Sequence, residues 1–304
     1  MLCVVPARCG RGPPHRSSGG RPSSGAVERW RSNCGCRLDG NRPPAQEWRG
    51  PLREALVVLA DHCHDVFERE GQIHFRDDPW AVRNAYGAVV AQDGDVLEAF
   101  VRAHLADHQS APSMQRAREL LELERATLRM FTSCAWFFDD VDRIETRQVL
   151  RYAARALELS GISSRLAPEF VRTLEAARGS TPGSGTASDL FVREALPHRD
   201  TAWSVAAGAI ACAAQGTLHT HVASYDVLLH NHDGVWDVMV THRRTGQQAT
   251  LSGRMIGSGP SLLVALTQID VPDGASHEIP IHEFPESLAR ELLRSFANSD
   301  EALH

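Results

Sequence analysis

The sequence predicts an α+β fold, in which a helical bundle is followed by a small antiparallel β-meander and a C-terminal helix. Across residues 48–178, apolar side chains recur every three or four positions, which is the period of an amphipathic helix. From about Ser224 the period changes to two, the period of a strand, and turns such as HNHDG and RRTG separate the strand-like segments. Helices first and strands second indicate a fold whose helical and β parts are segregated.

Helix positions follow from the apolar spacing and from the residues that begin and end helices. The first helix should begin near Pro51 and end at Gly71, because proline is favoured in a first turn and glycine after a last one. A helix from Ser113 to about Trp136 carries two adjacent apolar stripes, so it should be contacted on several sides. We expect the other helices at 79–92, 95–107, 142–159, 168–178, 188–196, 201–217 and from about Pro285 onward.

The β part should contain about four antiparallel strands with alternating apolar residues. Their segments are SYDVLLH (224–230), VWDVMVTH (235–242), QATLSGRM (248–255) and SLLVALTQI (261–269).

Composition divides the chain further. Residues 1–26 are rich in Gly, Pro, Ser and Arg and contain no carboxylate. Such a segment cannot bury enough apolar area to offset the entropy of ordering, so we expect it to be disordered. The stretch GSTPGSGTA at 179–187 has the composition of a flexible linker. It would separate a helical bundle at 48–178 from a region at 188–304 that holds the later helices and the strands.

Charge and cysteine content narrow the class of protein. The net charge is −6, and the basic residues are scattered apart from the first few dozen positions, so we expect neither nucleic acid nor a membrane as partner. No apolar run reaches the length that crosses a bilayer. The 7 cysteines are odd in number and include no CxxC pair, so neither a disulfide framework nor a zinc knuckle is indicated. A reducing, cytoplasmic compartment is therefore expected.

The β part is rich in histidine, at His219, His221, His230, His232 and His242. The spacings HTH and HNH would place both members of a pair on one face of a strand, as metal ligands require. No cysteine or glutamate completes a ligand set nearby in the sequence, and HNHDG is also typical of a polar hairpin loop. We therefore expect no metal and no other cofactor.

The stretch from Thr132 to Glu145, called the acidic-aromatic motif below, is the most unusual part of the chain. Three consecutive aromatic residues, Trp136 to Phe138, lead into four carboxylates, which are Asp139, Asp140, Asp142 and Glu145. Aromatic ring faces stack on the apolar face of a pyranose, and carboxylates accept hydrogen bonds from its hydroxyl groups. The motif therefore predicts a sugar-contacting site.

A structural interpretation of the same residues stays open. Asp142 and Glu145 have the spacing of an acidic capping box that would start the next helix. Trp136 and the two phenylalanines would then belong to the core. The chain also contains no GxSxG elbow, GK[ST] phosphate loop, GxGxxG or HExxH, so hydrolase, kinase and dehydrogenase interpretations lack a starting motif.

Two segments resemble a known family. The run LLELERATLRMFTSCAWFFDDVDRIETRQVLRYAARALEL (120–159) is similar to the hallmark of a bacterial domain-of-unknown-function family, number 3536. WRGPLREALVVLADHCHDVFEREG (48–71) resembles the start of that domain. FRDDPWAVRNAY (75–86) and LAPEF (166–170) agree with it in order. The likeness covers about residues 46–300 and is loose in the β part.

That family follows the catalytic barrel of glycoside hydrolase family 57 proteins, which are α-amylase- or α-mannosidase-like. VERWRSNCGC (27–36) resembles the closing stretch of the barrel, so residues 27–47 would be a remnant of its end. A frameshift or a misassigned start is our hypothesis for residues 1–26. Retaining glycosidases need two carboxyl groups about 5–5.5 Å apart, and the resemblance implies that both come from a barrel outside this sequence.

The resemblance thus implies an accessory C-terminal region of a family 57-like glycoside hydrolase acting on α-glucans, which is not catalytic alone. Its expected partners are an α-glucan or oligosaccharide and the catalytic barrel. The candidate sugar-contacting residues are Trp136, Asp139, Asp140 and Glu145, and we assign no catalytic, cofactor or metal residue. Two alternatives stay open: a self-contained carbohydrate hydrolase that uses the acidic-aromatic motif at 132–145, and a structural docking or oligomerisation module.

Overall fold

The computed structural model describes residues 30, 33, 47–92, 94–106, 110–196 and 201–301. The expected disorder of residues 1–26 and nearly all of the expected barrel remnant at 27–47 lie outside this part. The chain divides into two compact units, one of residues 1–68 and 123–196 and the other of residues 69–122 and 197–304. Each unit is described by itself.

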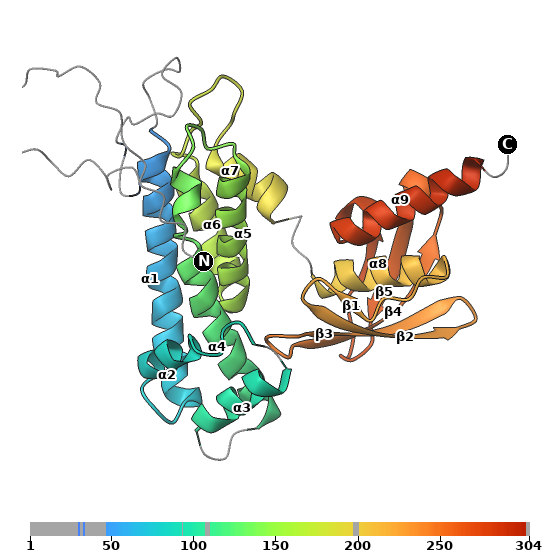
Figure 1. Ribbon diagram of the computed structural model, residues 1–304, viewed down its shortest axis with the longest axis horizontal. Coiled ribbons are helices and arrows are strands. Elements are labelled where there is room, and N and C mark those ends of the chain that lie inside the picture. Colours follow the sequence, from blue (N-terminus) through green and yellow to red (C-terminus); the bar gives the residue numbers. More distant parts are fainter. Residues whose placement is uncertain are drawn as a thin grey trace, which may run out of the picture. The chain divides into compact units, whose positions relative to one another are not determined.

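The predicted α+β class, with a helical region, an antiparallel sheet and a final helix, is confirmed (Figure 1). The α-helices within the described residues are α1 (Arg49–His74), α2 (Pro79–Tyr86), α3 (Gly94–His104), α4 (Ala111–Arg129), α5 (Ile144–Leu159), α6 (Ser163–Leu174), α7 (Ala187–Leu190), α8 (Ala202–Ala214) and α9 (Glu286–Glu301). A short 3-10 helix, η2 (Ser133–Trp136), lies between α4 and α5, and a π-helical turn, η3 (Phe191–Ala195), continues α7.

The prediction that one helix runs from Ser113 to about Trp136 is wrong at its end, because α4 stops at Arg129. The amides of Phe131 and Thr132 bond to carbonyls three residues back, at 3.2 Å each, which tightens the last turn and ends the α-helical ladder. The acidic-aromatic motif therefore forms a compact turn between two helices. Apolar periodicity continued into this turn because Met130, Ala135 and Trp136 are buried, although Ser133 and Cys134 between them are exposed.

The first unit has a core of aliphatic and small side chains. On α5 the buried positions recur at helical spacing, among them Val149, Leu150, Ala153 and Leu157. Phe170 of α6 meets Phe191 of η3 edge to face, with ring centroids 5.1 Å apart. The helix α5 contacts both η3 and η2, so the core of this unit also holds the turn that carries the motif.

The second unit contains a six-stranded antiparallel sheet in which each strand pairs with the next along the chain. The strands are β1 (His221–Val222), β2 (Tyr225–His232), β3 (Val235–His242), β4 (Gln248–Ile256), β5 (Leu263–Gln268) and β6 (Ser276–Pro280). Four strands were expected, at the positions of β2 to β5. The two further strands lie at the edges of the sheet, where β1 has only two residues and β6 alternates too weakly to be recognised.

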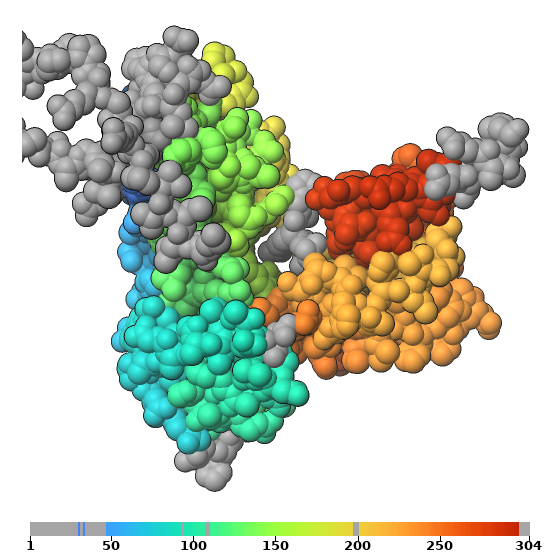
Figure 2. Space-filling view, in the orientation of Figure 1, coloured from blue at the N-terminus to red at the C-terminus, as the bar shows by residue number. Residues whose placement is uncertain are grey.

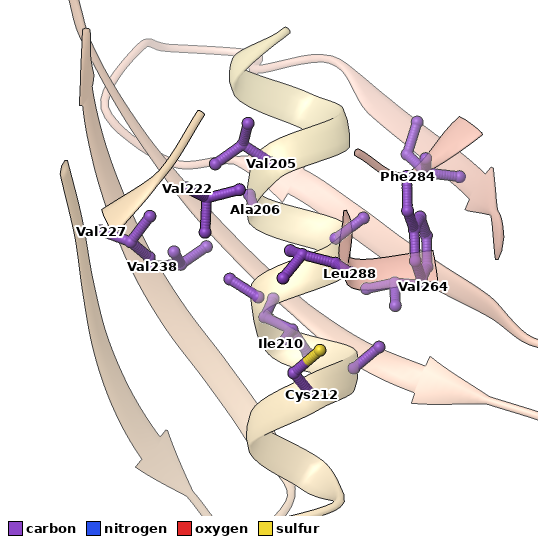
Figure 3. Close-up of a cluster of buried hydrophobic side chains, with 14 of the residues drawn as sticks. Val205, Ala206, Ile210, Cys212, Val222, Val227, Val238, Val264, Phe284 and Leu288 are labelled. Carbon is purple, nitrogen blue, oxygen red and sulfur yellow. The ribbon is translucent and has the colours of Figure 1, made fainter. Parts of the chain in front are cut away.

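One face of the sheet is covered by α8, and α9 packs on α8 (Figure 1). Valine and leucine side chains of the strands meet the small residues of α8, as Figure 3 shows for Val227, Val238 and Val264. In the space-filling view α9, in red, lies directly against the orange region that contains α8 and the sheet (Figure 2). A β-carbon on Gly208 of α8 would come within 2.8 Å of Leu288 of α9, so glycine at this position allows the close approach of the two helices.

Candidate functional site

Trp136, the aromatic residue expected to stack on a sugar, is fully buried. Its indole N–H donates to the carbonyl oxygen of Arg49 at 3.3 Å, which joins the motif to the first residue of α1. The guanidinium of Arg53 lies 5.7 Å from the centre of the Trp136 ring and 4.6 Å from that of Phe131. In the structure Trp136 is therefore a core residue, held by a cation–π contact and by one hydrogen bond.

Asp139 lies beside a buried arginine. The Arg49 guanidinium has no solvent exposure, and its Nη2 lies 3.9 Å from Asp139 Oδ1. The same nitrogen donates to the carbonyl oxygen of Phe138 at 2.8 Å. A buried cation needs a counter-charge, and the adjacent Asp139 carboxylate supplies it.

Asp140 binds backbone amides. One carboxylate oxygen accepts from Val141 N at 2.8 Å and from Ser180 N at 3.1 Å, and the other accepts from Thr181 N at 3.0 Å. Residues 179–187, expected to be a flexible linker, thus form a loop that closes on this carboxylate. The Gly179 amide also donates to the Gly185 carbonyl oxygen at 2.9 Å, across the base of the loop.

Glu145 is separated from these three residues by its place in the first turn of α5, where it is only partly buried. The capping box expected from Asp142 and Glu145 does not form, because Arg143 occupies the N-cap and makes no side-chain capping bond. Asp142 instead pairs with Arg147, whose Nε also lies 2.9 Å from Glu194 Oε2. The structure therefore brings Trp136, Asp139 and Asp140 together in the interior and leaves Glu145 nearer the surface.

The residues of the motif that face solvent are others. Phe137 and Phe138 are partly exposed, and their rings meet edge to face at 5.2 Å. The Arg143 guanidinium lies 5.2 Å from the centre of the Phe138 ring. These two aromatic rings are partly accessible to a ligand, whereas the Trp136 ring is fully buried.

Two residues of the preceding segment contact the same end of the first unit. The indole N–H of Trp30 donates to the Ser133 carbonyl oxygen at 3.0 Å, and Arg53 Nη1 donates to the Trp30 carbonyl oxygen at 3.2 Å. The side-chain oxygen of Asn33 accepts from Gly50 N at 2.7 Å. The first amides of a helix lack an intrahelical acceptor, so Asn33 supplies one to α1 from seventeen residues upstream. Sequence reasoning missed both residues because nothing local marks them.

Two of the histidines in the HTH and HNH sequences lie beside aspartates. His221 Nδ1 lies 2.6 Å from Asp226, and His232 Nε2 lies 3.7 Å from Asp237. His242 is buried against the Tyr225 ring. His219 instead lies beside Glu291 of α9 and near Cys212 of α8. Within the described residues this is the one group of three histidine, cysteine or acidic side chains whose ligand atoms lie close together.

The described helices include none with the length and apolar composition needed to cross a membrane.

Comparison with known proteins identifies one matching family. The model of a family described as a domain of unknown function, DUF3536, matches residues 45–254. Neither the curated proteins nor the solved structures contain a match to the chain.

Proposed function

Because the chain belongs to the DUF3536 family, whose model matches more than half of it, we propose that it is the non-catalytic accessory region of a glycoside hydrolase family 57-like protein acting on α-glucans. Its role there is to hold the polypeptide that precedes α1. The resemblance of residues 27–36 to the closing stretch of the catalytic domain makes that polypeptide the end of the catalytic barrel.

The observation that carries the proposal is the engagement of Trp30 and Asn33. Both residues belong to the segment before α1, and both bond to the end of the first unit where the motif lies. Trp30 is held from two sides, because its indole donates to Ser133 and its carbonyl oxygen accepts from Arg53. A site with one backbone acceptor, one backbone donor and one guanidinium donor is suited to fixing the path of an incoming chain.

The state of the motif's carboxylates favours the same role. Asp140 is bonded to three amides, Asp139 lies against the buried Arg49, and Asp142 pairs with Arg147. Glycosidic cleavage requires one carboxyl group that gives a proton and a second that faces the sugar ring from across the bond. Carboxylates already engaged in the fold are better suited to shaping a docking end than to this chemistry.

Hydrogen exchange on the full 304-residue chain tests the docking role. Trp30→Ala and Asn33→Ala should each accelerate exchange of amides in residues 47–50 and 133–136 by about tenfold, the effect of losing one hydrogen bond. Trp80→Ala is the matched control, because it makes the same chemical change on α2 in the other unit. Unchanged exchange in both variants, or release of reducing ends from maltooligosaccharides by the wild-type chain, would overturn the proposal.

Sugar contact is a second candidate, favoured by the two partly exposed aromatic rings of the motif. Phe137 and Phe138 present perpendicular faces next to Arg143 and the half-exposed Asp142, which is the combination of stacking surface and polar groups that an oligosaccharide needs. Phe138→Ala should weaken maltooligosaccharide binding in a calorimetric titration by about tenfold, the typical loss of one aromatic contact. Phe100→Ala in α3 should leave binding unchanged, and no heat at millimolar oligosaccharide would remove this candidate.

A further inference from the structure

Three potential metal ligands meet where α8 ends and α9 passes, at Cys212, His219 and Glu291. Each offers one ligand atom, and the three atoms lie within 4.8 Å of one another. His219 Nε2 lies 3.1 Å from Glu291 Oε2 and 3.3 Å from Oε1. The three side chains come from two helices and the loop between α8 and β1, so only the folded chain assembles them.

The backbone brings these residues together by a sharp reversal after α8. The amides of Gln215 and Thr217 both donate to the carbonyl oxygen of Cys212, at 3.0 and 2.9 Å. Gly216 adopts a φ of 88°, a left-handed conformation that glycine adopts without strain. The chain therefore turns back over the end of α8, and His219 returns toward Cys212.

The packing of α9 on α8 supplies the third ligand. Leu288 packs against Gly208, where the absent β-carbon lets the helices approach closely. Cys212 lies about one helical turn after Gly208 on α8, and Glu291 lies about one turn after Leu288 on α9. Both side chains are therefore one turn further along the same contact between the two helices. The thiol lies inside the buried cluster near the C-terminal end of α8 (Figure 3).

The three residues differ in their access to solvent in a way that suits a binding site. Cys212 is buried, whereas the His219 and Glu291 side chains retain 25% and 40% of their exposure. A metal ion can thus enter from the side of the imidazole and the carboxylate and reach the sulfur from there. Cys212 belongs to the buried apolar cluster of this unit, and such low-dielectric surroundings strengthen a metal–thiolate bond.

We propose that Cys212, His219 and Glu291 bind one Zn²⁺ ion, with water as the fourth ligand. One sulfur, one nitrogen and one oxygen donor suit a borderline-soft ion without geometric preference, and a thiolate disfavours Mg²⁺ and Ca²⁺, which require oxygen ligands. Bond lengths of about 2.0–2.3 Å in a tetrahedron separate ligand atoms by about 3.3–3.8 Å. The 3.1 Å from His219 Nε2 to Glu291 Oε2 is already close to this range, and the Cys212 sulfur lies within 4.8 Å of both ligand atoms.

Binding replaces the S–H bond of Cys212 with a Zn–S bond and releases the proton to solvent. Burial, and to a lesser degree the nearby Glu291 carboxylate, raises the pKa of the Cys212 thiol to about 12.

The test uses the tag-free 304-residue chain with Zn²⁺ for calorimetry and Co²⁺ for spectroscopy. We expect one ion per chain, a sulfur-to-cobalt charge-transfer band in the near ultraviolet, and a higher unfolding temperature with Zn²⁺. Cys212→Ser should abolish the band, and His219→Ala and Glu291→Gln should each weaken binding by more than about 100-fold, beyond the loss caused by removing a supporting residue.

Three controls separate this site from other ligands of the chain. His221→Ala changes an exposed histidine two residues away, and Glu286→Gln changes an exposed glutamate on the same helix, so both should bind as the wild type does. The double variant Cys34→Ser, Cys36→Ser removes the closest cysteine pair in the sequence and should also retain the band. The proposal is overturned if no charge-transfer band forms, or if the band persists in His219→Ala and Glu291→Gln but is lost in the Cys34/Cys36 double variant.

Discussion

Asp140 satisfies three backbone amides with one carboxylate, two of which belong to a loop forty residues further along the chain. Its position after three aromatic residues predicted a role toward sugar hydroxyl groups. A carboxylate accepts from N–H and O–H donors equally well, so residue type alone does not distinguish an amide partner from a sugar. Only the path of residues 179–185 brings those amides to the carboxylate.

Replacing Asp140 tests this role. Asp140→Ala should lower the free energy of unfolding by about 2–4 kcal/mol, because it leaves three amides, one of them buried, without their charged acceptor. Asp140→Asn keeps one acceptor oxygen, so its free energy of unfolding should lie between those of Asp140→Ala and the wild type. Urea titration gives both values. Asp142 is half-exposed, so Asp142→Ala should lower the free energy of unfolding by less than about 1 kcal/mol, and equal losses at the two positions would contradict a special role for Asp140.

At the scale of elements, the turn between β3 and β4 is joined to the helices of its own unit by Arg244. Its Nε donates to Glu122 Oε1 of α4 at 2.8 Å, its Nη1 donates to the Gln92 carbonyl oxygen at 2.7 Å, and its Nη2 contacts the Tyr86 hydroxyl. The Tyr86 hydroxyl donates to the same Glu122 oxygen at 2.5 Å. Burial and the Glu122 carboxylate raise the pKa of Tyr86, so the phenol remains a donor at neutral pH.

Replacing Arg244 and its neighbour Arg243 in turn should show how much each contributes to the free energy of unfolding. Arg244 is 15% exposed, and Arg244→Ala should destabilise the protein by about 2–4 kcal/mol because the largely buried Glu122 carboxylate loses its positively charged neighbour. Arg243 is 40% exposed and 3.8 Å from Asp226, so Arg243→Ala should cost less than about 1 kcal/mol. Chemical denaturation of the two variants measures the difference, and equal losses would show that the Arg244 cluster contributes nothing specific.

The contacts of Arg244 with Tyr86, Gln92 and Glu122 also show which contacts between elements cannot be predicted from sequence patterns. The turn RRTG was recognised as a hairpin connection from its composition and its flanking strands. Which of its two arginines points to the helices depends on the twist and register of β3 and β4. Both arginines lie in the turn between the paired residues of β3 and β4, and no local pattern marks Arg244 as the one that bonds to Glu122.

At the scale of the whole molecule, the two compact units do not follow the chain in tandem. Each unit combines an early and a late segment, and α1 and α4 each contribute residues to both units. Composition placed a boundary at residues 179–187, where the chain instead loops back to Asp140 within the first unit. Glycine and serine content reports the absence of large side chains, and such segments can be ordered when other residues bind their amides.

The sequence by itself determined the α+β class, the order of the elements and the approximate bounds of most helices and of β2 to β5. It could do so because apolar periodicity is a local property that each element carries alone. The two edge strands and the end of α4 were decided by pairing and by burial in the folded chain. The burial of Trp136 and Asp140, and the meeting of Cys212, His219 and Glu291, were also decided there. Such contacts depend on side chains far apart in the sequence, and no local pattern encodes which of them the packing of helices and sheet brings together.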